Sequence, residues 1–245
     1  MALIEATNLS RTYRLGEERI IGVAGASLTL EAGEFAVLAG PSGSGKTTLL
    51  NLLGLLDQPD SGELLFEGKN VSGLTEPERA RVRRDRLGFV FQTSQLIPVL
   101  SAEENVAFPL WIRELPEMEC LKRARECLAA VGLEGLGSRR PDALSGGQRQ
   151  RAAVARAIVG EPALVLADEP TASLDTETAA RLMDLFDELH RSRGVSFLFS
   201  SHDVRMIERA PRRISLLDGK IVADEMVAVG RSVPGGSGHA QGTHA

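Results

Sequence analysis

The sequence has few cysteines and few aromatic residues, and this shortage excludes several classes of protein. Its 245 residues include two cysteines, one tryptophan and one tyrosine. Cys120 and Cys127 lie seven residues apart in a predicted helix, about 10 Å along its axis, which is too far for a disulfide. Because no metal-ligand spacing surrounds them, the two thiols indicate a reducing cytoplasm rather than a disulfide scaffold or a zinc domain.

The sequence also lacks excess positive charge and long apolar runs. Its net charge is −5, from 33 acidic and 28 basic side chains, so we expect no nucleic-acid partner. No apolar run approaches the roughly 18 residues that cross a bilayer, and the first five residues lack the basic segment of a signal peptide. We therefore expect a cytoplasmic protein that associates with a membrane only through partners. The apolar content of 43% is ordinary for one large folded unit.

The most informative feature that is present is a glycine-rich loop between a predicted strand and a predicted helix. Residues 40–47 read GPSGSGKT and fit the phosphate-binding pattern G-x-x-x-x-G-K-[ST]. An apolar run at 34–39 precedes the loop, and a helix to about Leu56 follows it. Glycines let backbone amides surround a polyphosphate, and the helix N-terminus adds positive partial charge. We expect Lys46 on the β- and γ-phosphates and Thr47 on Mg²⁺.

Two further motifs carry chemistry. Asp168 and Glu169 follow the apolar strand 163–167, where one carboxylate can hold Mg²⁺ and the next can act as general base for a water. Residues 144–148 read LSGGQ and open a helix, with Ser145 as the expected N-cap and glycine amides that can approach an anion. Taken alone, the acidic pair could be a turn before a proline, and LSGGQ could be no more than a capped helix.

The rest of the sequence predicts strands and helices, with a segment in the middle of the chain that lacks long strand-like runs. Strands are expected over 3–39 with turns at 16–18 and 31–33, and then at 63–68, 88–92, 163–167 and 195–200, with a hairpin of 213–217 and 220–223. Helices are expected at 76–86, 116–131, 147–159 and 176–191. From residue 93 to about 142 the chain is predicted to form helices broken at Pro98, Pro109, Pro116 and Gly132.

The phosphate loop, LSGGQ and the strand-end acidic pair, in this order, resemble an ATP-binding cassette (ABC) ATPase from about Leu3 to Glu225. The resemblance implies an α/β fold: a P-loop NTPase core with an N-terminal antiparallel β-subdomain and an inserted α-helical subdomain at about 93–143. Together these would form a nucleotide-binding domain over 1–229. The remainder, 230–245, is rich in glycine, serine and histidine and is expected to be disordered.

The resemblance also assigns roles by position. The nucleotide is ATP, contacted by Tyr13, Gly40, Pro41, Ser42, Gly43, Ser44, Gly45, Lys46, Thr47, Thr48, Ser145, Gly146, Gly147, Gln148 and Asp175. Of these, Ser145 and Gly147 would contact the γ-phosphate of the ATP held by the opposite subunit. This implies a head-to-tail homodimer with two ATPs between the subunits. The catalytic residues would be Glu169 as base, His202 as γ-phosphate donor, Gln92 and Lys46, and the Mg²⁺ ligands Thr47, Gln92 and Asp168.

Three of these residues also have ordinary structural interpretations. Tyr13, expected to stack on adenine, could be a half-buried strand aromatic. His202 could be a surface or cap residue, and Gln92 a polar side chain at the end of a strand. Their positions in the family pattern favour the functional roles.

The segments GFVFQ at 88–92, LIP at 96–98 and ENVAFPL at 104–110 resemble the lipoprotein-releasing and macrolide-exporting branch of the family. That branch implies an ATPase on the cytoplasmic face of the inner membrane, bound to integral membrane permease subunits and driving mechanotransmission. Residues 96–100 would line the groove for a permease coupling helix, or belong to the core of the helical subdomain. A regulatory module acting on a cell-envelope partner without transport, and a compact importer ATPase, stay open as alternatives.

Five arginines between residues 79 and 86 form a basic run. They could approach anionic headgroups, but a solvated helix face is the more ordinary interpretation.

Overall fold

Three buried apolar runs form the middle of the main sheet in the computed structural model, which describes residues 2–16 and 18–227. They are β3 (Phe35–Ala39), β7 (Leu164–Asp168) and β8 (Ser196–Ser201). All three are parallel and buried on both faces, which explains their nearly unbroken apolar sequence. The sheet has the order β10-β9-β3-β8-β7-β6, and its outer strands are β6 (Leu87–Val90), β9 (Arg212–Leu217) and β10 (Lys220–Met226).

Side-chain alternation along these strands divides the interior into two cores. Val37 and Phe199 face the core that contains α5 (Gly146–Ile158) and α6 (Thr176–Arg193). Leu38 and Leu198 face the other core, which contains α1 (Lys46–Leu53). By the same alternation, Asp168 at the end of β7 and Ser200 near the end of β8 lie on the face that carries α1.

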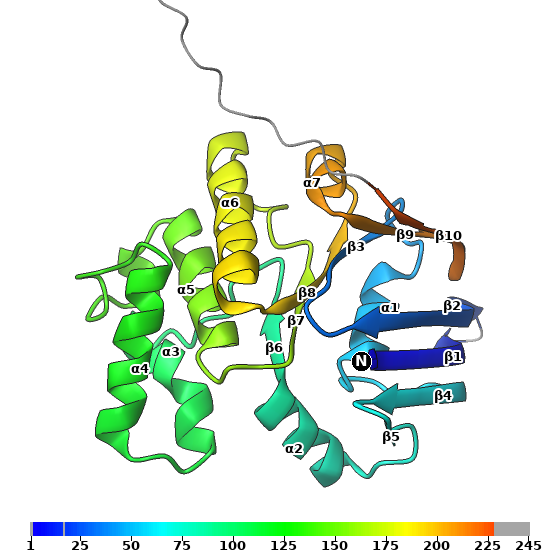
Figure 1. Ribbon diagram of the computed structural model, residues 1–245, viewed down its shortest axis with the longest axis horizontal. Helices are drawn as coiled ribbons and strands as arrows, with labels where there is room; N and C mark the ends of the chain where they lie inside the picture. Colours follow the sequence, from blue (N-terminus) through cyan, green and yellow to red (C-terminus); the bar gives the residue numbers. More distant parts are fainter. Residues whose placement is uncertain (1, 17, 228–245) are drawn as a thin grey trace, which may run out of the picture.

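The second core is closed by a small antiparallel sheet, as expected for the N-terminal region (Figure 1). Its strands are β1 (Ala2–Leu15), β2 (Glu18–Glu31), β4 (Ser61–Phe66) and β5 (Lys69–Asn70), in the order β2-β1-β4-β5. Helix α1 contacts both sheets, so the phosphate loop that precedes it is held between two layers of strands.

The helical region lies on the opposite side of the main sheet, at the left in Figure 1. It contains α3 (Ala102–Ile112), α4 (Glu117–Ala130) and the short 3-10 helix η1 (Pro141–Ala143), while α2 (Glu76–Arg86) and α7 (Val204–Arg209) lie nearer the core. Cys120 and Cys127 are buried in the first core with free thiols. Within residues 2–16 and 18–227, no helix has both the length and the apolar character to span a membrane.

Several predicted boundaries were wrong for local reasons. Helix α1 ends at Leu53, not near Leu56, because Gly54 caps it and Leu55 turns away with φ +57°. Pro109 lies inside α3 without breaking it, because α3 is held by its packing against α4 and α5. Strand β6 ends at Val90, so Gln92 lies in the following loop. The predicted tail at 230–245 lies outside the described residues.

Candidate functional site

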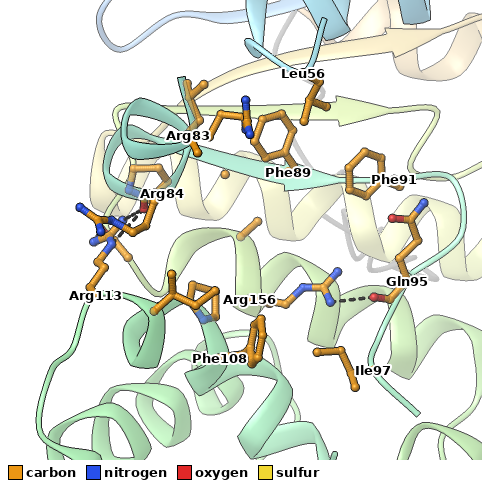
Figure 2. A pocket seen from close by; sticks show the side chains of 18 residues that line it. Leu56, Arg83, Arg84, Phe89, Phe91, Gln95, Ile97, Phe108, Arg113 and Arg156 are labelled. Atoms are coloured by element: carbon orange, nitrogen blue, oxygen red, sulfur yellow. Dashed lines mark hydrogen bonds between the residues drawn. The ribbon is translucent and has the colours of Figure 1, made fainter. Parts of the chain in front are cut away.

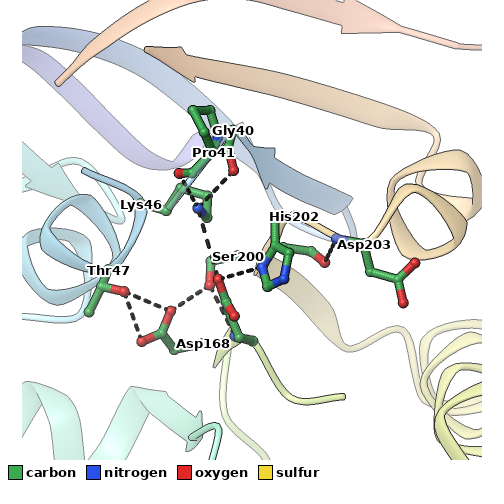
Figure 3. A network of polar contacts seen from close by, with 10 residues as sticks. Gly40, Pro41, Lys46, Thr47, Asp168, Ser200, His202 and Asp203 are labelled. Carbon is green, nitrogen blue, oxygen red and sulfur yellow. Dashed lines mark hydrogen bonds and ion pairs between the residues drawn. The ribbon is translucent and has the colours of Figure 1, made fainter. Parts of the chain in front are cut away.

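The glycine loop connects β3 to α1 and has a shape that requires glycine. A Cβ on Gly40 would lie 2.3 Å from the carbonyl oxygen of Leu216, and one on Gly45 would lie 2.2 Å from that of Gly22. Gly45 also has φ +102°, which side chains rarely adopt. The buried Lys46 turns back into the loop, where its Nζ donates to the carbonyls of Gly40 at 2.9 Å and of Pro41 at 2.8 Å (Figure 3).

The loop and the start of α1 are suited to a polyanion. No acidic residue lies in the first turn of α1, so the positive end of the helix dipole is not neutralised there. The hydroxyl of Ser44 is buried and has no hydrogen-bond partner among the described residues, which leaves it free for a ligand. A phosphate chain can satisfy these donors together with the ammonium of Lys46.

Thr47 and Asp168 meet beside the loop in the manner expected of magnesium ligands. The Thr47 hydroxyl lies 3.1 and 3.0 Å from the two carboxylate oxygens of Asp168 (Figure 3). A hydroxyl and a carboxylate are hard oxygen donors, and Mg²⁺ bound to nucleotide phosphates needs only one or two such protein ligands. In the described part of the chain, no group of three or more His, Cys, Asp or Glu side chains could hold a metal. The pair fits a metal shared with a nucleotide.

The other predicted catalytic side chains gather next to this pair. Glu169, Gln92 and His202 line one cavity of about 420 Å³. Glu169 Oε1 lies 3.0 Å from Nδ1 of His202 and 3.9 Å from Nζ of Lys46. Glu169 has φ +44°, which a residue with a side chain holds only when surrounding contacts enforce it. The structure thus brings a carboxylate, an imidazole and an ammonium to the edge of the phosphate loop.

Tyr13 lies beside the helix that follows the phosphate loop. Its hydroxyl donates to Asp57 at 2.8 Å, and the guanidinium of Arg11 lies 5.0 Å from the ring centroid. A Cβ on Gly22 would lie 2.9 Å from the ring of Tyr13 and 2.8 Å from the methyl group of Thr48. Burial, and the bond to Asp57, raise the pKa of Tyr13. The ring is close to the loop, and adenine stacking stays a prediction.

The LSGGQ segment does not join the phosphate loop within one chain. Ser145 caps α5 through a capping box, accepting from the Gln148 amide at 3.2 Å while Gln148 Oε1 accepts from the Ser145 amide at 2.9 Å. Ser145, Gly147 and Gln148 line a separate cavity with residues of α6. Asp175 caps α6, and hydrogen bonds from Thr178 and from backbone amides lower its pKa.

Sequence reasoning missed residues that hold the Gln92 loop. Gln150 donates to the carbonyl of Phe91 at 2.8 Å, and Arg156 donates to those of Gln95 at 2.7 Å and Ser94 at 2.9 Å. Burial lowers the pKa of Arg156. α5 carries five long polar side chains, so the sequence alone did not mark Gln150 and Arg156 as the two that hold this loop. Ser200 was also missed, although it is a hydroxyl at the end of an apolar strand.

Comparison with known proteins agrees with this geometry. The ABC transporter family matches residues 23–172, more than half of the chain. The ABC transporter ATP-binding protein YvrO of Bacillus subtilis (strain 168), described as uncharacterized, is 41% identical over 91% of this chain and 97% of its own length. The lipoprotein-releasing system ATP-binding protein LolD of Nitrobacter hamburgensis is 43% identical over 88% of this chain and 93% of its own length.

A solved structure supports the fold and its nucleotide chemistry. The dimeric ATP-binding cassette MJ0796, in a post-hydrolysis state with ADP and Pi, is 39% identical and superposes with a TM-score of 0.85 over 92% of this chain and 99% of the other. The α/β core, the antiparallel sheet and the phosphate loop described above are therefore those of an ATP-hydrolysing cassette. The chain belongs to the ABC transporter family, as an ATP-binding subunit with ATPase activity.

Proposed function

We propose that the chain is the ATPase of a lipoprotein-releasing type of complex, in which it closes as a head-to-tail dimer on two ATPs to drive permease subunits. The observation that carries the dimer is the separation of the two nucleotide motifs, and the 43% identity to the lipoprotein-releasing system ATP-binding protein LolD supports the type of complex. The phosphate loop and the Ser145–Gln148 segment lie in different places on one chain, so a site that uses both must combine two copies. The dimeric state of the similar MJ0796 cassette supports the same arrangement.

Within that dimer, the clustered side chains divide the work of hydrolysis. Glu169 accepts the proton of the attacking water, and His202 and Lys46 donate to the γ-phosphate as charge develops on it. Thr47 and Asp168, with Gln92, would hold Mg²⁺. When bound at these residues, Mg²⁺ would supply positive charge that offsets the negative charge of the phosphates. Ser145 and Gly147 of the second copy would approach the γ-phosphate from the opposite side.

A groove between the core and the helical region is an argument for the proposed membrane partner (Figure 2). Its volume is about 480 Å³, and it is lined by apolar side chains, among them Leu56, Phe89, Phe91, Ile97, Phe108 and Ile112. Arginines border it, among them Arg83, Arg84 and Arg113. A short amphipathic helix that presents apolar side chains, offered by a permease on the cytoplasmic side, would complement such a surface.

The segment 96–100 contributes to both of its predicted surroundings. Leu96 is buried in the core, whereas Ile97 lines the groove. Groove and core are therefore built by neighbouring residues of one loop, so a partner in the groove would press directly on the helical region.

The basic run on α2 does not favour direct membrane contact. Arg79 and Arg83 pair with Glu76, Arg84 with Asp85, and Arg86 with Glu67. Because four of the five arginines form local ion pairs, the helix is better explained as a solvated face.

Co-purification from native membranes tests the proposal, with Phe108→Asp as the groove variant. Val222 is exposed on β10 outside the groove, so Val222→Asp is the matched control. We expect the wild type and the control to retain a four-helix permease with a large extracytoplasmic domain, and Phe108→Asp to lose it. A partner with six or more helices would instead favour an ordinary importer or exporter. Absence of any membrane partner would favour the regulatory module.

A further inference from the structure

Ser200 connects the two acidic residues of the site to each other. It is fully buried at the end of β8, directly beside Asp168 in the register of the parallel pair β7–β8. Its hydroxyl donates to Asp168 Oδ1 at 2.5 Å and accepts the backbone N–H of Glu169 at 3.0 Å (Figure 3). The Ser200 carbonyl accepts the same N–H at 3.2 Å. Both the donor and the acceptor capacity of this hydroxyl are thus used on consecutive acidic residues.

Full burial at this position is energetically costly for a polar side chain. The preceding residues of β8, Phe197, Leu198 and Phe199, are buried and apolar, so an aliphatic residue would suit position 200 equally well for packing. A buried hydroxyl costs free energy unless it is hydrogen-bonded, and hydrogen bonds to a carboxylate are among the stronger ones. The contacts of Ser200 therefore serve the acidic pair rather than the core.

The two contacts act on different properties of the site. The Asp168 carboxylate receives hydroxyls from Thr47 on one side and Ser200 on the other. Thr47 is itself a candidate metal ligand, and a hydroxyl oxygen turned to a metal no longer donates to Asp168 in the same way. Ser200 would then be the remaining side-chain donor that orients this carboxylate.

The second contact fixes the backbone of the proposed base. Glu169 has φ +44°, a left-handed conformation that is unfavourable for a residue with a side chain. Its N–H is held by the hydroxyl and the carbonyl of Ser200. In this backbone conformation the Glu169 carboxylate lies 3.0 Å from Nδ1 of His202.

We propose that Ser200 is a positioning residue that orients Asp168 for the metal and holds Glu169 in its left-handed conformation for proton abstraction. This inference rests on the roles proposed above for Asp168 and Glu169. The Ser200 hydroxyl would thereby couple the orientation of Asp168, the metal ligand, to the alignment of Glu169, the base.

The test compares Ser200→Ala with Ser196→Ala in the full chain. Ser196 is a matched control, because it is buried on the same strand and its hydroxyl accepts the Gly33 amide at 2.9 Å, far from the acidic pair. For Ser200→Ala we expect kcat to fall about ten- to a hundredfold, as for loss of one charge-assisted hydrogen bond, with KM for ATP changed by no more than about threefold. Ser196→Ala should keep kcat, and Ser200→Thr should restore most of it.

Two readouts do not depend on turnover. In the nucleotide-free and metal-free chain, amide hydrogen exchange at Glu169 should be faster in Ser200→Ala than in Ser196→Ala. In EDTA, Ser200→Ala should bind a fluorescent ATP analogue as tightly as Ser196→Ala does. On addition of Mg²⁺, the affinity of Ser200→Ala should increase less than that of Ser196→Ala. If Ser200→Ala does not fold, Ser200→Cys, with a poor hydrogen-bond donor of similar shape, takes its place with the same expectations.

The proposal is overturned if Ser200→Ala matches Ser196→Ala in kcat, Mg²⁺ response and Glu169 exchange, or if Ser200→Thr folds stably without restoring kcat. Asp168→Asn and Glu169→Gln separate this failure from failure of the proposed function. If both lose activity while Ser200→Ala does not, only the role of Ser200 is wrong. If either retains wild-type turnover, the underlying assignment of metal ligand or base is wrong.

Discussion

Asn105 closes the loop that forms one wall of the groove, and its removal should destabilise the protein strongly. The side chain is fully buried on α3. Its Nδ2 donates to the carbonyls of Ile97 at 3.0 Å, Leu100 at 3.1 Å and Ser101 at 2.9 Å, while Oδ1 accepts the Ile97 amide at 2.7 Å. One amide group thus replaces the hydrogen bonds that secondary structure would give to this irregular segment.

The expected loss of stability depends on which of the backbone groups bonded to Asn105 keep another hydrogen-bond partner. In Asn105→Ala, the Ser101 carbonyl keeps the backbone N–H of residue 105, and the Ile97 carbonyl keeps that of Leu100. The Ile97 amide and the Leu100 carbonyl have no other hydrogen bond in the described structure. Each buried group left unpaired costs about 1–3 kcal/mol, and partial access of water to the loop reduces this. We expect a loss of about 2–4 kcal/mol in the free energy of unfolding.

Equilibrium unfolding in urea without nucleotide measures this loss. The matched control is Asn70→Ala, because Asn70 makes two side-chain hydrogen bonds on an exposed strand. It should change stability by less than about 0.5 kcal/mol. Asn105→Asp should also destabilise, since it turns a carboxylate toward three carbonyl oxygens. A loss below about 1 kcal/mol for Asn105→Ala would refute the reasoning, because the unpaired groups would then carry no cost.

Two further predictions concern the phosphate loop and pH. Gly45→Ala should weaken ATP binding by at least about tenfold, because its Cβ would lie 2.2 Å from the Gly22 carbonyl, whereas Gly33→Ala, with φ +77° and open space around it, should leave the ATP affinity unchanged. Titration with a fluorescent ATP analogue decides this, and equal affinities would contradict it. Hydrogen bonds from the Thr12 amide and the Arg11 guanidinium lower the pKa of Asp60. Its stabilising contribution is therefore present above the ordinary carboxyl pKa of 3.8 and lost as pH falls through the lower folded value. The difference in melting temperature between the wild type and Asp60→Asn should narrow below about pH 4, and a constant difference would contradict this.

The parts of the fold that could be predicted from sequence are those with local causes. The glycine loop could be predicted from its own sequence pattern and from the strand and helix beside it. The capping box of Ser145 and Gln148 marks the start of α5, and the acidic first turn and basic last turn of α2 match its predicted bounds. Alternating burial then follows from the period of two along each strand.

The parts that could not be predicted depend on contacts between distant segments. The hydroxyl of Ser200 has a role only because β7 and β8 are adjacent and in register. Pro109 was expected to break a helix, but α3 continues past it because its other contacts hold it against α4 and α5. The groove is assembled from α2, β6, α3 and α5, and no single segment of the sequence carries its shape.

Sedimentation velocity of the Glu169→Gln variant tests the central claim most directly, because this change keeps the shape of the side chain but removes the proposed base. We predict a monomer without nucleotide and a dimer with Mg²⁺ and ATP, with no steady-state hydrolysis. Adding Ser145→Arg should prevent the dimer while ATP binding persists. A variant that binds ATP but stays monomeric, or one that hydrolyses ATP at the wild-type rate, would contradict the account.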